Sequence, residues 1–164
     1  MLDTIIAEFV DPNAAVPPAI AMLRMFAALI FGGMIGLERE ADNHPAGLRT
    51  HIMITLAACL FALIAFELMG ATDRESVQFD PLRLIEAVTA GVAFLAAGSI
   101  ITSRGKVKGL TTGASMWLAG AVGLACGTGR LMLALQATIM TLIVLWLLSK
   151  ITTRVEKELS SDKD

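Results

Sequence analysis

Charged residues are scarce in this chain. They make up 17% of its 164 residues, whereas an ordinary soluble domain has roughly a quarter. Aromatic residues account for only 5%, and no basic patch is interleaved with them. The formal net charge is −2. The net charge itself says nothing about nucleic acid, but no basic patch suggests such binding, so we expect no nucleic-acid partner.

Cysteine is also rare, with Cys59 and Cys126 as the only two thiols. Cys59 falls in the middle of one apolar run and Cys126 near the end of another. We therefore expect them at different depths, where they cannot form a disulfide. Both are interpreted as small packing residues.

Apolar residues dominate instead. The chain is 55% hydrophobic, with a mean hydropathy of +0.71. Each apolar run has 17 or 18 residues and covers about 25–27 Å as a helix, slightly less than the ~30 Å hydrocarbon core of a bilayer. None shows the polar stripe at helical period that a soluble bundle needs. The sequence predicts an all-α membrane protein with a bundle of about five transmembrane helices, formed by residues 20–37, 52–69, 84–101, 110–126 and 131–148.

Three segments follow from this pattern. Residues 1–19 form an external N-terminal segment whose apolar residues share one helical face, which predicts a short interfacial helix. Its start is acidic, unlike a signal peptide. Residues 20–148 form the transmembrane domain, and residues 149–164 form a polar cytoplasmic tail. Asp80 and Pro81 predict the start of the third spanning helix, as its N-cap and first residue.

Orientation is predicted from the distribution of Lys and Arg between the connections. Nine of these residues lie in the connections 38–51 and 102–109 and in the tail, whereas three lie in the other connections. The larger set is expected in the cytoplasm. The N-terminus is therefore predicted outside and the C-terminus inside.

Small residues recur at short helical spacings, which allows helices to pack closely in a membrane. Either the bundle's own helices or a second copy of the chain fills such faces, and we favour packing within the chain. The predicted helix-packing residues are Gly32, Gly36, Ala93, Ala97, Gly98, Ala119, Gly123 and Gly127.

Two ionisable residues lie inside apolar runs. Arg24 and Glu86 are predicted at similar depth below the external interface, each on a small-residue face. Because an unpaired charge in a membrane is costly, we predict an ion pair between them. The alternative is that each side chain extends to the interface by itself.

The polar segment 38–51 and the basic connection 102–109 are predicted on the cytoplasmic side. We expect Glu38, Arg39, Glu40 and Arg49 to set the angle of helix entry and to contact a partner, and Thr50 to cap the second spanning helix. Lys106 and Lys108 belong to the same loop surface. Binding of these basic loops to anionic lipid headgroups is the alternative.

No catalytic or metal-binding pattern is found. The set Glu38, Glu40, Asp42, His44 and His51 contains metal-ligand residue types, but its spacing matches no zinc pattern. His44-Pro45 is typical of a turn. No nucleophile and base are paired, so we expect no enzyme activity, no cofactor and no bound metal.

Several short blocks stand in a defined order: 36–40 (Gly-Leu-Glu-Arg-Glu), 46–51 (Ala-Gly-Leu-Arg-Thr-His), Gly91 with Phe94-Leu95 and Ala97-Gly98, Val107 with Gly109-Leu110-Thr111-Thr112, and Trp117 with Gly123 and Gly127. In these blocks the chain resembles the membrane domain of the MgtC/SapB family of bacterial inner-membrane proteins. The resemblance covers residues 27–148. Two departures are Ala93 and Ala96, where the family pattern has glycines. Many relatives also carry a soluble C-terminal domain, for which this chain has only the short tail.

The resemblance implies a multi-pass protein of the bacterial inner membrane. Family members are linked to growth in low magnesium and, in pathogens, to survival inside host cells. They are regarded as regulators of other membrane proteins, so the expected partners are the lipid bilayer, another inner-membrane protein and, in a homo-oligomer, further copies of the chain. The alternatives are a magnesium or other cation transporter or channel acting as an oligomer, and a structural subunit of a larger complex.

Overall fold

The computed structural model describes residues 1, 14–41, 44–71, 80–103 and 106–161. The described chain forms five helices and one short hairpin: α2 (Pro18–Ala41), α3 (Leu48–Ala71), α4 (Pro81–Ser99), β1 (Ile101–Ser103), β2 (Lys106–Lys108), α5 (Leu110–Gly127) and α6 (Leu131–Ser161). Four helices, α2 to α5, are long and apolar enough to cross a membrane, and the apolar part of α6 is Leu131–Leu147. The predicted helical membrane fold is confirmed.

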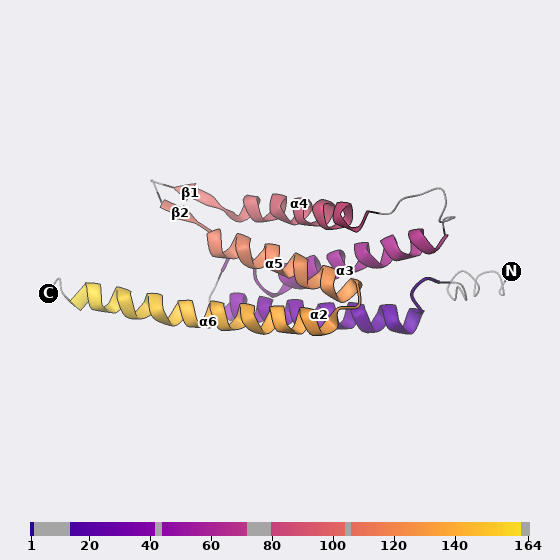
Figure 1. The fold of residues 1–164 in the computed structure, drawn as a ribbon. Helices are drawn as coiled ribbons and strands as arrows, with labels where there is room; N and C mark the ends of the chain where they lie inside the picture. The colour runs from indigo at the N-terminus through magenta and orange to yellow at the C-terminus, as the bar shows by residue number, and fades with distance from the viewer. Residues whose placement is uncertain (2–13, 42–43, 72–79, 104–105, 162–164) are drawn as a thin grey trace.

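The helices run side by side and alternate in direction (Figure 1). Helix α2 packs on α3, α5 and α6, and α5 also packs on α3 and α6. Helix α4 lies at the edge and packs chiefly on α5. Helix α5 is therefore the centre of the bundle.

Two ends of the bundle are distinct in Figure 1. The end of α2, the start of α3, the hairpin and the C-terminal part of α6 lie at one end, called here the hairpin end. The starts of α2 and α4 and the turn between α5 and α6 lie at the opposite end. This arrangement matches the predicted grouping of the connections. Which end faces the cytoplasm stays a prediction.

Helix α4 begins as the sequence predicts. Asp80 is its N-cap, with the carboxylate accepting a hydrogen bond from the backbone N–H of Leu82 at 2.9 Å, and Pro81 is the first helical residue. This arrangement satisfies a backbone N–H that has no partner within the helix.

Helix α5 ends in a Schellman motif. The N–H of Gly129 donates to the carbonyl of Cys126, and that of Arg130 donates to the carbonyl of Ala125. Gly129 has a φ of +77°, the left-handed conformation that this helix ending requires and that glycine adopts without strain. These bonds use the carbonyls of Ala125 and Cys126, so the Gly127 carbonyl remains available to a donor from another helix.

The connection between α4 and α5 was expected as a loop, but it contains a two-stranded antiparallel hairpin. Ile101 pairs with Lys108 and Ser103 with Lys106, so two residues join the strands, as in common tight hairpins. Gly109 then turns the chain into α5 with a φ of +89°. A Cβ at Gly109 would overlap the backbone of Ser99, so this residue must be small as well as flexible.

Two predicted segments are only partly described. The interfacial helix predicted within 1–19 falls mostly outside the described residues. The tail predicted from residue 149 is helical through Ser161, as a continuation of α6.

Close packing of α5 on α3 depends on two glycines. A Cβ at Gly123 would lie 2.9 Å from Cα of Thr55, and one at Gly127 would lie 3.0 Å from Cα of Cys59. Because the helices touch at Gly127, Cys126 and Cys59 lie at the same level, buried in one apolar cluster as free thiols. The expectation that they lie at different depths is wrong.

Helix α4 makes much looser contacts. Its buried residues are Val88, Val92 and Ala96, which face α5. Ala93, Ala97 and Gly98, which we expected to pack within the chain, are exposed. A Cβ at Gly91 or Gly98 would meet nothing within 4 Å. The structure therefore corrects the packing prediction for α4: Ala93, Ala97 and Gly98 face away from the bundle, and Ala96 is the small residue that packs on α5.

Candidate functional site

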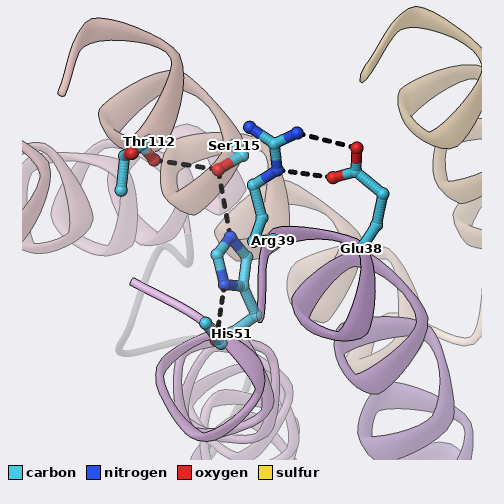
Figure 2. A network of polar contacts seen from close by, with 6 residues as sticks. Glu38, Arg39, His51, Thr112 and Ser115 are labelled. Carbon is cyan, nitrogen blue, oxygen red and sulfur yellow. Dashed lines mark hydrogen bonds and ion pairs between the residues drawn. The ribbon is translucent and has the colours of Figure 1, made fainter. Parts of the chain in front are cut away.

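A cluster of polar side chains lies where α2, α3 and α5 meet at the hairpin end. We call it the junction cluster. Figure 2 shows it, with two groups of contacts drawn as dashed lines. Its members are Glu38 and Arg39 from the last turn of α2, His51 from the first turns of α3, and Thr112 and Ser115 from the start of α5.

The first group is an ion pair within α2. Nε and Nη2 of Arg39 donate to the two carboxylate oxygens of Glu38, the second at 2.7 Å. Arg39 is only 3% exposed and Glu38 is 20% exposed. A bidentate pair of this kind holds the guanidinium in one orientation, and its neutralising partner lets a charged side chain remain buried.

The second group connects α3 to α5 through His51, which is fully buried. Its Nδ1 lies 2.9 Å from the Gly47 carbonyl, and its Nε2 lies 3.1 Å from Oγ of Ser115. A carbonyl only accepts hydrogen bonds, so Nδ1 carries a proton and donates it. In the neutral ring, Nε2 then accepts from the Ser115 hydroxyl. The same hydroxyl lies 2.9 Å from the Thr112 carbonyl, so its single proton is shared between these two acceptors.

Glycines in α2 allow α3 to approach this cluster. A Cβ at Gly36 would lie 2.7 Å from Cα of Leu48 and 3.1 Å from Cβ of His51. One at Gly32 would lie 2.9 Å from the His51 carbonyl and would overlap Thr55. The start of α3 is therefore held against α2 at backbone distance.

Glu40 provides the cap of α3. Its Oε2 accepts a hydrogen bond of 3.0 Å from the backbone N–H of Leu48, the first residue of the helix. A carboxylate at this position also interacts favourably with the positive end of the helix dipole. A Cβ at Gly47 would overlap the Glu40 carboxylate. Thr50 was expected to cap this helix, but the helix begins two residues earlier, so Thr50 lies inside its first turn.

The loop residues that we expected to act together divide into an inner and an outer set. Glu38 and Arg39 belong to the junction cluster, whereas Arg49 and Lys108 are exposed at the hairpin end. The backbone of Lys106 lies at the start of the same strand, β2, two residues before Lys108. Arg39 is buried and paired with Glu38, whereas Arg49 and Lys108 face outward.

Arg24 has a different partner from the one predicted. Its Nη1 donates to the Gly127 carbonyl at 2.8 Å, and a Cβ at Gly129 would lie 2.7 Å from its Nη2. The guanidinium thus covers the C-terminal end of α5, where the helix dipole favours a positive charge. The predicted Arg24–Glu86 ion pair is not formed in the described structure. Glu86 is exposed on α4, and α3 and α5 lie between α4 and α2 (Figure 1).

A second carboxylate ties α2 to α3 at the opposite end. The two oxygens of Glu67, in the last turns of α3, accept hydrogen bonds of 3.0 Å from the backbone N–H groups of Ala15 and Val16. Glu40 and Glu67 thus each bind main-chain N–H groups of the neighbouring segment. Sequence reasoning missed both contacts because backbone donors have no residue signature.

His51 and Ser115 have the residue types of a base and a nucleophile. The pair is enclosed by α2, α3 and α5, with His51 fully buried and Ser115 3% exposed. A general base must reach a substrate, and a hydroxyl sealed between helices does not. We interpret the pair as a structural connection between α3 and α5.

Comparison with known proteins agrees with this membrane fold. The sequence profile of the MgtC family matches residues 25–154. The putative magnesium transporter YhiD of Escherichia coli K12 is 34% identical over 135 residues, which cover 82% of this chain and 63% of YhiD. Protein SapB of Bacillus subtilis is 30% identical over 162 residues, which cover 98% of this chain and 67% of SapB.

Protein MgtC of Salmonella typhimurium 14028s is 33% identical over 136 residues, which cover 83% of this chain and 55% of that protein. The chain therefore spans less than two thirds of YhiD and of MgtC. No solved structure matches it. The profile match covers most of the sequence, and the chain belongs to the MgtC family.

Proposed function

We propose that this chain is a non-enzymatic protein of the bacterial inner membrane that regulates another membrane protein during adaptation to low magnesium and, in a pathogen, during growth inside host cells. The link to magnesium rests on relatives named MgtC and putative magnesium transporter. The regulatory role rests on the closed interior and on the charged groups exposed at the hairpin end.

The closed interior is the observation that carries the proposal. Within the described chain, Arg24, His51 and Glu67 all use their polar atoms on protein groups. Buried threonines such as Thr55 and Thr138 donate to carbonyls of their own helices. A path for a hydrated divalent cation needs several oxygen ligands that are free to face water or the ion. The buried polar groups named here are instead bonded to other side chains or to the backbone.

Partner contact is assigned to Arg49 and Lys108. Both are exposed, both are basic, and both lie at the hairpin end, from which the C-terminal part of α6 also extends (Figure 1). The distribution of Lys and Arg predicts that this end faces the cytoplasm. A cytoplasmic basic surface fits an acidic cytoplasmic loop of a second membrane protein.

Site-specific photocrosslinking tests this assignment in cells. A photoreactive amino acid at Arg49 or Lys108 should capture one distinct membrane protein. The same amino acid at Thr128, exposed at the opposite end, is the matched control and should not capture it. Capture of the same species from all three positions, or of only further copies of this chain, contradicts the proposal.

Complementation adds a functional measurement. In a deletion strain grown at limiting magnesium, Arg49→Ala should lose most of the growth rescue while the protein level stays unchanged. Arg39→Ala should instead lower the protein level, because Arg39 neutralises Glu38 inside the junction cluster. Full rescue by Arg49→Ala would remove this residue from the partner surface.

A cation transporter is the second candidate, because YhiD is named a putative magnesium transporter. Purified full-length chain in liposomes loaded with a magnesium-sensitive dye separates the two functions. The regulator gives no flux above that of protein-free vesicles. Flux that disappears in Glu86→Gln would establish transport and would overturn the regulatory proposal.

A further inference from the structure

Helix α6 carries an outward-facing amide within its apolar part. That part, Leu131–Leu147, contains three polar residues. The hydroxyls of Thr138 and Thr141 are buried and donate to carbonyls of their own helix at 2.8 and 2.6 Å. Gln136 is exposed instead, and no hydrogen bond among the described residues includes its side chain. The described chain therefore leaves this amide without a partner.

The depth of Gln136 makes an unbonded amide unfavourable. It lies five residues after Leu131, the first residue of α6, which is about 7.5 Å along the helix. The hydrocarbon of a bilayer supplies neither donors nor acceptors at such a position, whereas an amide offers two N–H donors and a carbonyl acceptor. This face therefore favours a partner that brings both kinds of group to the level of Gln136.

The residues around Gln136 form a regular seam. Their separations are three, four, three and four residues, which is the repeat of a helix that packs along a second helix. All are exposed, on the side of α6 turned away from its contacts with α2 and α5. We call them the outer α6 seam: Leu133, Gln136, Met140, Ile143 and Leu147. The apolar members supply van der Waals packing and the amide supplies hydrogen bonds, which together drive helix association in a membrane.

A second copy of this chain meets the requirement of the amide. Two copies inserted in the same orientation are related by a twofold axis along the membrane normal, which sets each seam residue opposite its own equivalent. This arrangement is unfavourable for a charged side chain such as Glu86 of α4, because like charges then meet. An amide is complementary to itself: the carbonyl oxygen of each Gln136 accepts an N–H from Gln136 of the partner subunit. The other seam residues are apolar and pack against their equivalents.

Lys150, the charged residue that follows the seam, does not oppose this contact. Its Nζ lies 4.0 Å from the centre of the Trp146 ring. Trp146 precedes Leu147 by one residue, which places it about 100° around the helix from that member of the seam. The ammonium is therefore drawn toward the flank of α6, away from the axis between two copies.

We propose that the outer α6 seam is the interface of a parallel homodimer of this chain, joined by reciprocal hydrogen bonds between the two Gln136 amides. The interface uses α6 alone and involves neither Arg49 nor Lys108. It therefore goes beyond the regulatory role proposed above and stands or fails separately from it.

Disulfide crosslinking of the full-length chain in liposomes, at low protein-to-lipid ratio, tests the interface. The native chain is the background, because both its thiols are fully buried. Met140→Cys and Ile143→Cys should give crosslinked dimers in several-fold higher yield than Phe61→Cys on α3 and Phe94→Cys on α4, which replace exposed side chains of other helices. Equal yields at the four positions indicate random collision and overturn the proposal. Highest yield at Phe61 or Phe94 assigns the contact to another helix and also overturns it.

Removal of the amide gives an independent measurement of the same contact. By energy transfer between labelled copies in liposomes, Gln136→Leu should weaken the dimer about threefold to thirtyfold, the effect of losing interhelical hydrogen bonds in a membrane. Gln136→Asn keeps an amide and should retain most of the affinity, and Met140→Leu is the matched apolar control and should change it little. Monomer unfolding in detergent should not be weakened by Gln136→Leu, because the amide has no partner within the described chain.

Three results would overturn the proposal. Gln136→Leu that associates as tightly as the native chain removes the amide contact. Gln136→Asn that is as weak as Gln136→Leu shows that side-chain shape, and not the amide, holds the helices together. A native chain that is monomeric in liposomes removes the homodimer and leaves the face of α6 to a different protein or to lipid.

Discussion

Helices α4 and α5 are both rich in small residues, yet the structure uses these residues in opposite ways. In α5, Gly123 and Gly127 bring the backbone to contact distance of α3. In α4, Gly91 and Gly98 face open space. The difference shows that small residues at helical spacing predict the capacity for close packing and do not identify the partner.

Position in the bundle explains the contrast. Helix α5 has neighbours on several sides, whereas α4 rests on α5 along one side (Figure 1). In a soluble protein the free side of α4 would be polar and easily recognised. In a membrane both sides are apolar, so the sequence does not distinguish the side that faces the chain from the side that faces outward.

The largest expected effect is a loss of stability when a glycine of α5 is replaced by alanine. The same replacement in α4 serves as its control. Gly123→Ala places a Cβ against the backbone of Thr55, so the helices must separate. We expect a loss of about 2–3 kcal/mol in the free energy of unfolding, measured by thermal unfolding in detergent. The matched control is Gly91→Ala, which meets no atom. Equal losses in the two variants would contradict the distinction between α4 and α5.

The two charges inside the apolar runs provide the next comparison. Arg24→Met removes the hydrogen bond to the Gly127 carbonyl and should lower the unfolding free energy by about 1.5–3 kcal/mol. Glu86→Gln, on the free face of α4, should change the stability of the monomer by less than about 0.5 kcal/mol. The measurement is unfolding at a dilution where the chain is monomeric. Similar losses for both variants would indicate that Arg24 and Glu86 are paired after all.

The junction cluster predicts a smaller effect. Ser115→Ala leaves Nε2 of His51 buried without its partner, which should cost about 1–2 kcal/mol. Thr111→Ala, at an exposed position one turn earlier in α5, is the control and should be nearly neutral. Hydrogen exchange should locate the loss at the start of α3, where Gly47 and His51 are connected. Unchanged protection of those amides would show that the contact is not stabilising.

The smallest expected effect is a gain. Gly91→Ala replaces the residue of lowest helix propensity in the middle of α4, apart from proline, without creating an overlap. The monomer should become more stable by about 0.5–1 kcal/mol. A destabilised Gly91→Ala monomer would reveal a contact to α4 that the described residues do not make.

Much of the fold follows from the sequence because hydrophobic length and helix signals are local. The apolar runs predict the helices, and Asp80-Pro81 predicts the first residue of α4, since a cap acts within one turn. The hairpin was missed although Gly105 stands between two strands whose β-branched residues include Ile101 and Val107. A single Gly in a short basic segment is a weak signal beside long helices.

The contacts of the candidate site are harder to predict because their partners are distant in sequence. Ser115 lies 64 residues from His51, and Gly127 lies 103 residues from Arg24. In the second case the acceptor is a backbone carbonyl, which every residue has. The sequence pattern suggested Glu86 as the partner of Arg24 because opposite side-chain charges can be recognised and main-chain acceptors cannot.

The Arg24 contact has a consequence for biogenesis. The guanidinium emerges from the ribosome with the first spanning helix, whereas the carbonyl that receives it is synthesised 103 residues later. Until then the helix carries a charge into the translocon without its final acceptor. The first spanning helix can therefore pack on α3 as soon as α3 is made, whereas its Arg24 contact forms only after α5, the fourth spanning helix, has been synthesised.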